Sequence, residues 1–189
     1  MNAIPRTTTI IAALLFVLTG SCVHPAAARG DANATFEALG KRYLDEFGRY
    51  TPVDATGLGD HRHDGNLDDL GAAGRARKLA WNESLLADLR RIDRSTLSRE
   101  NQVDAAALDN ELRYAIWTEQ QFRDWSWDPL VYTRLAGQAL YGLLARDFAP
   151  LPDRLRSLTA RLEELPRLLE QERANLVPER VPAIHAETA

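Results

Sequence analysis

Apolar side chains recur along most of the chain three or four residues apart, which is the spacing of an amphipathic α-helix. The first such stripe, within residues 31–50, consists of Phe36, Leu39, Tyr43 and Phe47. Asn33 or Thr35 is the expected N-cap of this helix, because a short polar side chain can accept a hydrogen bond from a free backbone N–H group there. Gly48 and Pro52 bracket its expected end.

The same spacing predicts helices over about 72–94, 98–125 and 130–146, and another from Pro150 onward. Ser98 is the expected N-cap of the 98–125 helix. Its end is expected near Trp125, because Pro129 excludes the residue before it from the helical conformation. This helix carries two apolar faces, so we expect it to be buried between neighbours. The faces are Leu108, Leu112, Ala115, Ile116 and Phe122, and Val103, Ala107, Tyr114 and Trp117.

The last helix has the most regular pattern, a seam of leucines with alternating spacings of four and three residues. The seam consists of Leu151, Leu155, Leu158, Leu162 and Leu165, and continues through Leu169 and Leu176. Pro166 interrupts it, and we expect a kink or break near Leu165 because a proline inside a helix costs about 3 kcal/mol or more. The seam is short for a coiled coil, so packing within a helical bundle is the favoured interpretation.

Residues 51–71 interrupt the helical pattern. Thr51, Pro52 and the glycines of this stretch predict a long loop, and a long loop within a compact domain often carries function. Elsewhere Ala and Leu far outnumber Val and Ile, and a content of 45% hydrophobic and 26% charged residues is typical of a globular protein. The sequence therefore predicts an all-α protein, an irregular bundle of about five to six helices after a signal peptide.

The beginning of the chain predicts export. The apolar run Ile10–Leu18 is about nine residues long, shorter than the roughly 20 that cross a membrane and typical of a secretory signal peptide. Two processing outcomes stay open. Cleavage after Ala28, which gives a signal peptide of residues 1–28, would release a helical domain of residues 29–189 into the periplasm. Alternatively, the signal ends before Cys22 in a lipobox-like segment, in which Leu18 lies one position too far away, and a lipid on Cys22 anchors the chain at the bacterial envelope.

Net charge, cysteine content and hydrophobicity limit the partners and covalent links that we expect for this chain. A net charge of −4 does not favour nucleic acid. The single cysteine excludes an intramolecular disulfide. No second apolar run follows Ile10–Leu18 in the sequence. We therefore expect membrane contact only through the signal peptide or the lipid anchor.

His61, His63 and Asp64 are the densest cluster of potential metal ligands. On a strand, both imidazoles would point to the same side. Asp60 and Arg62 crowd the cluster, however, and a loop whose Asp and His side chains bind backbone groups is the favoured interpretation. The three residues remain weak metal candidates, and we assign no metal ligand, cofactor-binding residue or catalytic residue to this chain.

Signatures of other chemistry are absent from the sequence. It contains no His-Glu-x-x-His zinc motif, no Gly-x-Ser-x-Gly elbow and no phosphate-binding Gly-x-x-x-x-Gly-Lys. Aromatic residues gather around Pro129, where they either fill a core corner between two helices, the favoured interpretation, or line a groove for sugars or peptides. These residues are Trp117, Trp125, Trp127 and Tyr132.

Several segments together resemble the bacterial family of domains of unknown function 885. They are YTPVDATGLGDHRHD (Tyr50–Asp64), DWSWDPLVY (Asp124–Tyr132), RLEELP (Arg161–Pro166) followed by ANL (Ala174–Leu176), and HAETA (His185–Ala189). Their order and spacing match the family over essentially the whole mature chain.

The resemblance implies an all-α fold related to zinc-dependent peptidases, exported and in some members lipid-anchored. The relatives are longer, and their zinc motif, a helical His-Glu followed by a further His, lies in the C-terminal part. Zinc is therefore implied only for full-length relatives, and no catalytic residue is carried over to this chain. The implied partners are the missing C-terminal part of the same fold and, in the intact protein, a peptide substrate.

Three functional hypotheses follow. In the first, the chain is the N-terminal fragment of an exported zinc-peptidase-like hydrolase, arises from a truncated frame or an incomplete gene, and is inactive by itself. In the second, it is a small exported helical binding module that uses its leucine seam. In the third, the His61, His63 and Asp64 loop binds a metal ion.

Overall fold

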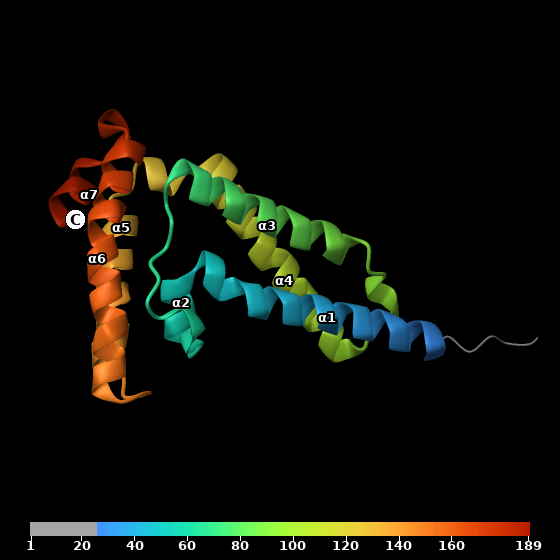
Figure 1. Cartoon of the computed structure of the whole chain (residues 1–189). Coiled ribbons are helices and arrows are strands. Elements are labelled where there is room, and N and C mark those ends of the chain that lie inside the picture. Colours follow the sequence, from blue (N-terminus) through green and yellow to red (C-terminus); the bar gives the residue numbers. More distant parts are fainter. Residues whose placement is uncertain (1–25) are drawn as a thin grey trace, which may run out of the picture.

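The computed structural model describes the backbone of residues 26–189 and the side chains from residue 32 onward. Within this range the chain forms seven α-helices and no strand (Figure 1). The helices are α1 (Ala26–Tyr50), α2 (Pro52–Leu58), α3 (Ala72–Arg90), α4 (Arg99–Trp117), α5 (Leu130–Ala145), α6 (Leu151–Asn175) and α7 (Ala183–Thr188). The predicted all-α fold is confirmed. None of these helices is both long and apolar enough to cross a membrane.

The helices form two groups that lie at a steep angle to each other (Figure 1). Helices α1, α3 and α4 run alongside one another, while α5 and α6 form a hairpin across one end of that group. The short helix α2 contacts both α1 and α5 and so joins the groups. Each group has an apolar core of its own, and α2 contributes to the second.

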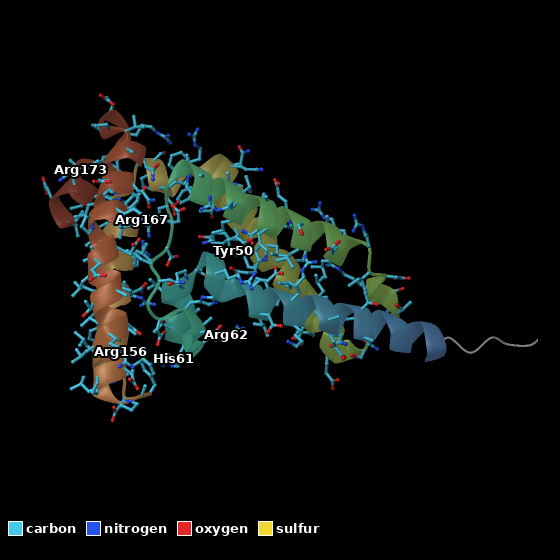
Figure 2. The ribbon with its side chains drawn as sticks, in the orientation of Figure 1. Tyr50, His61, Arg62, Arg156, Arg167 and Arg173 are labelled. Atoms are coloured by element: carbon cyan, nitrogen blue, oxygen red, sulfur yellow. The ribbon has the colours of Figure 1, made fainter. Side chains whose placement is uncertain are left out.

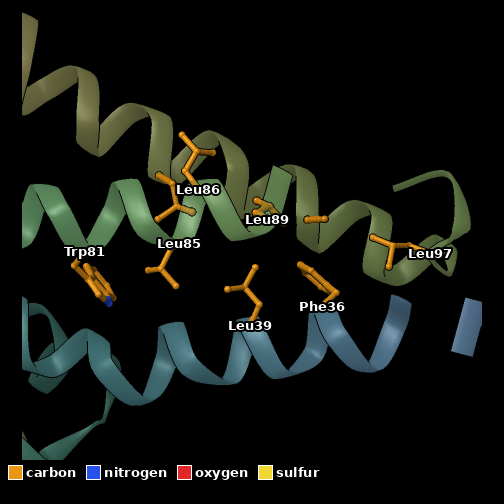
Figure 3. Close-up of a cluster of buried hydrophobic side chains, with 9 residues drawn as sticks. Phe36, Leu39, Trp81, Leu85, Leu86, Leu89 and Leu97 are labelled. Atoms are coloured by element: carbon orange, nitrogen blue, oxygen red, sulfur yellow. The ribbon is translucent and has the colours of Figure 1, made fainter. Parts of the chain in front are cut away.

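The first core lies between α1, α3 and α4 (Figure 3). Its buried members are Phe36, Leu39, Trp81, Leu85, Leu86, Leu89, Leu97, Ala105 and Leu112. Trp81 stacks between Tyr43 and Tyr50, with ring centroids 5.5 and 4.6 Å away. The second core is smaller and lies around α5 and α6; its buried members are Val53, Leu67, Tyr132, Ala139 and Leu168.

The N-caps were predicted with mixed success. Ser98 caps α4 as predicted, and its hydroxyl accepts a hydrogen bond from the backbone N–H of Asn101. Asn33 and Thr35 are not caps, because α1 begins earlier and includes both residues. The Asn33 side chain instead accepts hydrogen bonds from Ser98 N and Asn101 Nδ2, both at 2.9 Å, and so ties α1 to the start of α4.

The predicted long loop over residues 51–71 is only partly a loop. Pro52 starts α2, and a 3-10 turn covers His61–His63. Gly59 ends α2 with φ 93°, a left-handed conformation that favours glycine. The prediction failed because a seven-residue helix flanked by proline and glycine is too short to show a helical apolar period. Irregular backbone remains over residues 64–71.

Two predicted helix ends need correction. Helix α3 ends at Arg90, four residues before the predicted end. Helix α4 ends at Trp117, and a π-helical turn, Thr118–Phe122, continues it to Arg123, whose φ of 53° stops the helix. The second apolar face of α4 is not buried between neighbours, because Val103, Tyr114 and Trp117 are about half exposed within the described part of the chain.

Helix α6 departs most from its pattern. It runs through Pro166 without a break; the proline lies on the exposed side, where water can satisfy the carbonyl that loses its N–H partner. Four members of the leucine seam, Leu151, Leu155, Leu162 and Leu169, are 41–51% exposed within the described part of the chain. The buried line instead consists of Arg154, Arg161 and Leu168, seven residues apart.

Matched alanine substitutions can test which face of α6 is buried. We expect Leu168→Ala to lower the free energy of unfolding by about 2–5 kcal/mol, because it leaves a cavity in the second core. Leu162→Ala, on the exposed face, should change it by less than about 1 kcal/mol. Urea denaturation followed by circular dichroism would measure both values. The reverse order would mean that the leucine seam, and not the Arg154–Leu168 line, packs against the body of the protein.

Candidate functional site

The 3-10 turn separates the two candidate histidines. Nδ1 of His61 lies 3.0 Å from Oδ2 of Asp64, and the His61 ring stacks on Phe148 with centroids 3.6 Å apart. His61 lies beside the beginning of α6, where it lines a cavity together with Asp153 and Ser157 (Figure 2). His63 instead packs against α1, so closely that a Cβ on Gly48 would lie 2.6 Å from its Cδ2 atom. His61 and Asp64 therefore come together, and His63 does not join them.

Asp64 is buried and held from two sides. Besides His61, its carboxylate accepts a hydrogen bond from the Thr56 hydroxyl at 2.7 Å. The Thr56 oxygen in turn accepts a hydrogen bond from Nη2 of Arg161 at 2.6 Å. A chain of polar contacts thus runs from the partly exposed imidazole of His61 into the interior, where it ends on a fully buried guanidinium.

Arg161 donates hydrogen bonds to three different elements. Its guanidinium contacts the carbonyl oxygens of Pro52 in α2 (3.2 Å), Asn66 in the following loop (2.9 Å) and Ala139 in α5 (2.8 Å). Burial lowers the pKa of the guanidinium, and the negative charges of Asp64 and Asp68 oppose this shift. An arginine still remains charged in proteins, so the positive charge is balanced by two buried carboxylates and several carbonyl dipoles.

Arg154 lies seven residues before Arg161 on the same face of α6, and it connects α6 to the end of α5. It donates hydrogen bonds to carbonyl oxygens at and beyond the end of α5, including Leu143, Leu144 and Arg146 at 2.8–3.2 Å. The last carbonyl groups of a helix lack partners within it, and a cation near them is favourable. Sequence analysis missed both arginines as buried groups, because charged residues on an amphipathic helix are ordinarily assigned to the solvent side.

Asp68 binds the beginning of α2, as Arg154 binds the end of α5. Its Oδ2 accepts a hydrogen bond from Val53 N at 3.2 Å, so a carboxylate lies at the positive end of that helix. Burial raises the pKa of Asp68 to about 6, and nearby Asp54 adds to this shift. The Val53 N–H group and the positive charges of Lys78 and Arg161 oppose it.

A small cavity of about 270 Å³ lies where this network reaches the surface. It is lined by His61, Asp64, Phe148, Ala149, Asp153, Arg154 and Ser157. Most of its polar groups already have partners, since Asp153 pairs with Arg156 and Arg154 with the end of α5. The arrangement therefore orients one imidazole but presents no complete set of reacting groups.

The side chains described from residue 32 onward contain no group of three or more His, Cys, Asp or Glu residues that could hold a metal ion. His61 and Asp64 supply one imidazole–carboxylate pair, and His63 lies apart. The zinc that the family resemblance implies for longer relatives thus has no fitting set of ligands in this part of the protein. The predicted lipid anchor Cys22 lies outside the described residues.

Of the aromatic residues around Pro129, some fill a core corner and others lie on an open surface. Tyr132 is buried and donates a hydrogen bond to Trp125 O at 2.7 Å, while the guanidinium of Arg75 lies 3.6 Å from the centre of the Trp125 ring. These two residues fill a core corner. Trp117 is 47% exposed and lies beside Phe122, which contacts Trp127 edge to face. These aromatic rings form an open surface next to His185.

Comparison with known proteins decides the family. The model of a bacterial protein of unknown function, DUF885, matches residues 52–189. The chain belongs to the DUF885 family. The resemblance seen in the sequence motifs is thereby confirmed, and all of the polar network described above lies within the DUF885 match.

A solved structure is similar to this DUF885 chain. It is described as a putative lipoprotein of unknown function from Shewanella oneidensis, with a TM-score of 0.70 and 32% sequence identity. The match covers 75% of this chain and 26% of the Shewanella chain, so the DUF885 chain spans about a quarter of that relative. A comparison with curated proteins finds no match.

Removal of the buried guanidinium tests the network. We expect Arg161→Met to lower the free energy of unfolding by about 3–5 kcal/mol, because it leaves buried carbonyl oxygens without donors and buried carboxylates without a counter-charge. Arg156→Met, at an exposed arginine of the same helix, should change it by no more than about 0.5 kcal/mol. Denaturant unfolding of the two variants provides the measurement. Equal effects would show that Arg161 does not organise the fold.

The raised pKa of Asp68 predicts a pH dependence. The Asp68 carboxyl group binds a proton more tightly in the folded state than in the unfolded state. Its contribution to the free energy of unfolding therefore increases as the pH falls from about 6 to about 4. Asp68→Asn removes this dependence. We expect the stability of the parent relative to the variant to rise by about 2–3 kcal/mol over that range. Thermal and urea unfolding of both proteins at several pH values would measure it, and parallel pH profiles would contradict it.

Proposed function

We propose that this chain is the N-terminal helical part of an exported, peptidase-like hydrolase, in which it forms one wall of a larger helical domain and supplies no catalytic residue. The observation that carries the proposal is the match of the chain to only 26% of the Shewanella protein at 32% identity. The hydrolase class rests on the motif resemblance, which implies a zinc-dependent peptidase fold.

Exposed apolar side chains support the idea of a larger domain. Four leucines of α6 lie along one open face, and Trp117 and Phe122 form a second apolar area at the end of α4. Contiguous exposed apolar surface is ordinarily covered by another part of the protein or by a partner. We expect the remaining part of the DUF885 fold to cover the α6 leucines.

The intact hydrolase would contain zinc and act on a peptide. Because residues 32–189 hold no fitting set of ligands, we place the zinc ligands in the length of the relatives that this chain does not match. The chain would contribute the wall and the stability of the cleft. Its rigid polar network suits that task, since a wall must hold its position while substrates enter and leave.

Export is part of the proposal. The apolar run Ile10–Leu18 has the length of the apolar segment of a signal peptide, and the similar Shewanella protein is described as a putative lipoprotein. Cleavage after Ala28 and lipidation of Cys22 remain the two alternatives. Mass spectrometry of the protein purified from cells distinguishes them, because only the second leaves a lipid on the N-terminal residue.

The exposed leucines also favour a second candidate function, a small exported helical module that binds a partner through α6. A module should unfold cooperatively as a monomer or a defined dimer. A part of a larger domain should aggregate or bind hydrophobic dyes until the remaining part is added. Thermal unfolding and analytical ultracentrifugation of residues 29–189 separate the two functions.

Zinc content and peptide hydrolysis test the proposed function. We expect the purified chain to hold less than stoichiometric zinc and to cleave none of a set of quenched fluorescent peptides, because it lacks a fitting set of ligands. The full-length Shewanella protein, measured in parallel by elemental analysis and the same assay, should hold zinc and hydrolyse peptides. Activity of the short chain with stoichiometric zinc would overturn the fragment idea, and an inactive, zinc-free Shewanella protein would overturn the hydrolase class.

Sequencing of the locus beyond the codon for Ala189 completes this test. A reading frame that continues to a helical His-Glu zinc motif would assign the activity to the longer protein. A stop codon directly after Ala189 would instead leave a product without peptidase activity, whose function must then lie in binding.

A further inference from the structure

A groove lies between α1 and α4, beside the first core. Its volume is about 650 Å³, and we call it the α1–α4 groove. Its apolar lining consists of Phe36, Gly40, Tyr43, Leu44, Ala107 and Leu108. Leu44 is 65% exposed and Ala107 is also exposed, whereas Phe36 is buried and Tyr43 and Leu108 are partly buried.

Negative charge surrounds the apolar lining. Glu37, Asp104 and Glu111 lie along the groove, and none of them forms an ion pair with an arginine or lysine among the described residues. Lys41, the basic residue of the lining, pairs with Asp45. Glu111 lies close enough to Tyr43 to add to the rise of its pKa, which burial mainly causes. The groove therefore combines an apolar floor with a net negative rim.

Gly40 leaves space in the middle of the floor. A Cβ atom built on it has no neighbour within 4 Å, so the chain itself does not require glycine here for close packing. Glycine is nevertheless unfavourable inside a helix, by roughly 1 kcal/mol relative to alanine. Gly40 and, on the opposite helix, Ala107 both line the groove with small residues, and we call the open space at Gly40 the recess.

We propose that the α1–α4 groove docks a cationic amphipathic helix of a separate protein. Two antiparallel or parallel helices with an apolar floor receive an amphipathic helix by its apolar face. The acidic rim selects Lys or Arg residues on the flanks of that face and repels anionic segments. The charge of the rim assigns the chemistry of the occupant, because the carboxylates of Glu37, Asp104 and Glu111 are complementary to Lys or Arg side chains.

This inference does not depend on the proposed function, because it concerns a different face. The leucines of α6 lie on the hairpin of the second group, while the groove lies on the first group. A failure of the zinc and hydrolysis test leaves the groove unchanged, and a failure of the binding test described next leaves the proposed hydrolase unchanged.

A model peptide tests the groove directly. The probe is a fluorescein-labelled amphipathic helix of leucine and lysine, about 18 residues or 27 Å long. We expect saturable binding to the full chain by fluorescence anisotropy, weaker at high salt because the charges are then screened. The same peptide with glutamate in place of lysine should not bind, and neither should a scrambled Leu/Lys peptide without an apolar face.

Variants locate the binding surface. Asp104→Lys combined with Glu111→Lys should weaken binding about tenfold or more. Glu170→Lys on α6, the matched control far from the groove, should leave the affinity unchanged. Gly40→Leu should fill the recess and weaken binding while it keeps or raises the melting temperature, because the recess is empty and leucine favours the helix.

Three outcomes would overturn the inference. They are absence of binding, equal binding of the lysine and glutamate peptides, and binding that the groove variants leave unchanged. A second copy of this chain as the occupant is the remaining alternative, and concentration-dependent dimerisation that Gly40→Leu abolishes would establish it in place of a separate partner.

Discussion

The buried guanidinium of Arg161 is the interaction on which the second group of helices depends. It binds carbonyl oxygens of α2, of the following loop and of α5 at once, and it reaches Asp64 through Thr56. An isolated buried charge would destabilise the fold, so these acceptors must stay in place together. A leucine at this position could fill the same space but could not fix three backbone segments relative to α6. We infer that the network secures the arrangement of the segments more than it adds to net stability.

This constraint explains where the sequence pattern succeeded and where it failed. The positions of α3, α4, α5 and α6 follow from local periodicity and, for α4, from the Ser98 cap, so they could be predicted. The buried face of α6 could not. Arg154 and Arg161 share a face with Leu168, whereas the more regular leucines lie outward. Burial of Arg161 depends on carbonyl acceptors about 20 to 110 residues away in the chain, which no local pattern contains.

The residue types of the candidate site indicated the correct loop, but they did not show which groups its side chains bind. The density of His61, His63 and Asp64 drew attention to the correct loop, and the interpretation as a loop that binds its own neighbours describes most of its contacts. The turn could not be predicted, because a three-residue 3-10 helix has no period of its own. It directs His61 toward Phe148 and His63 toward Gly48, and so separates two imidazoles that a strand would have placed together.

The polar side chains with unusual environments lie in the interior of this chain. The side chains with unusual environments, Arg154, Arg161, Asp64 and Asp68, all face inward and have partners. The exposed apolar surface of the described chain includes the leucines of α6, the aromatic rings at the end of α4 and Leu44 in the acidic groove beside α1. Under the proposed function, the rest of a larger fold would cover the leucines of α6. The acidic groove selects by charge, which is what a reversible partner requires. The two proposals therefore assign different faces to different contacts, the leucines of α6 to the rest of a larger fold and the acidic groove to a separate cationic helix.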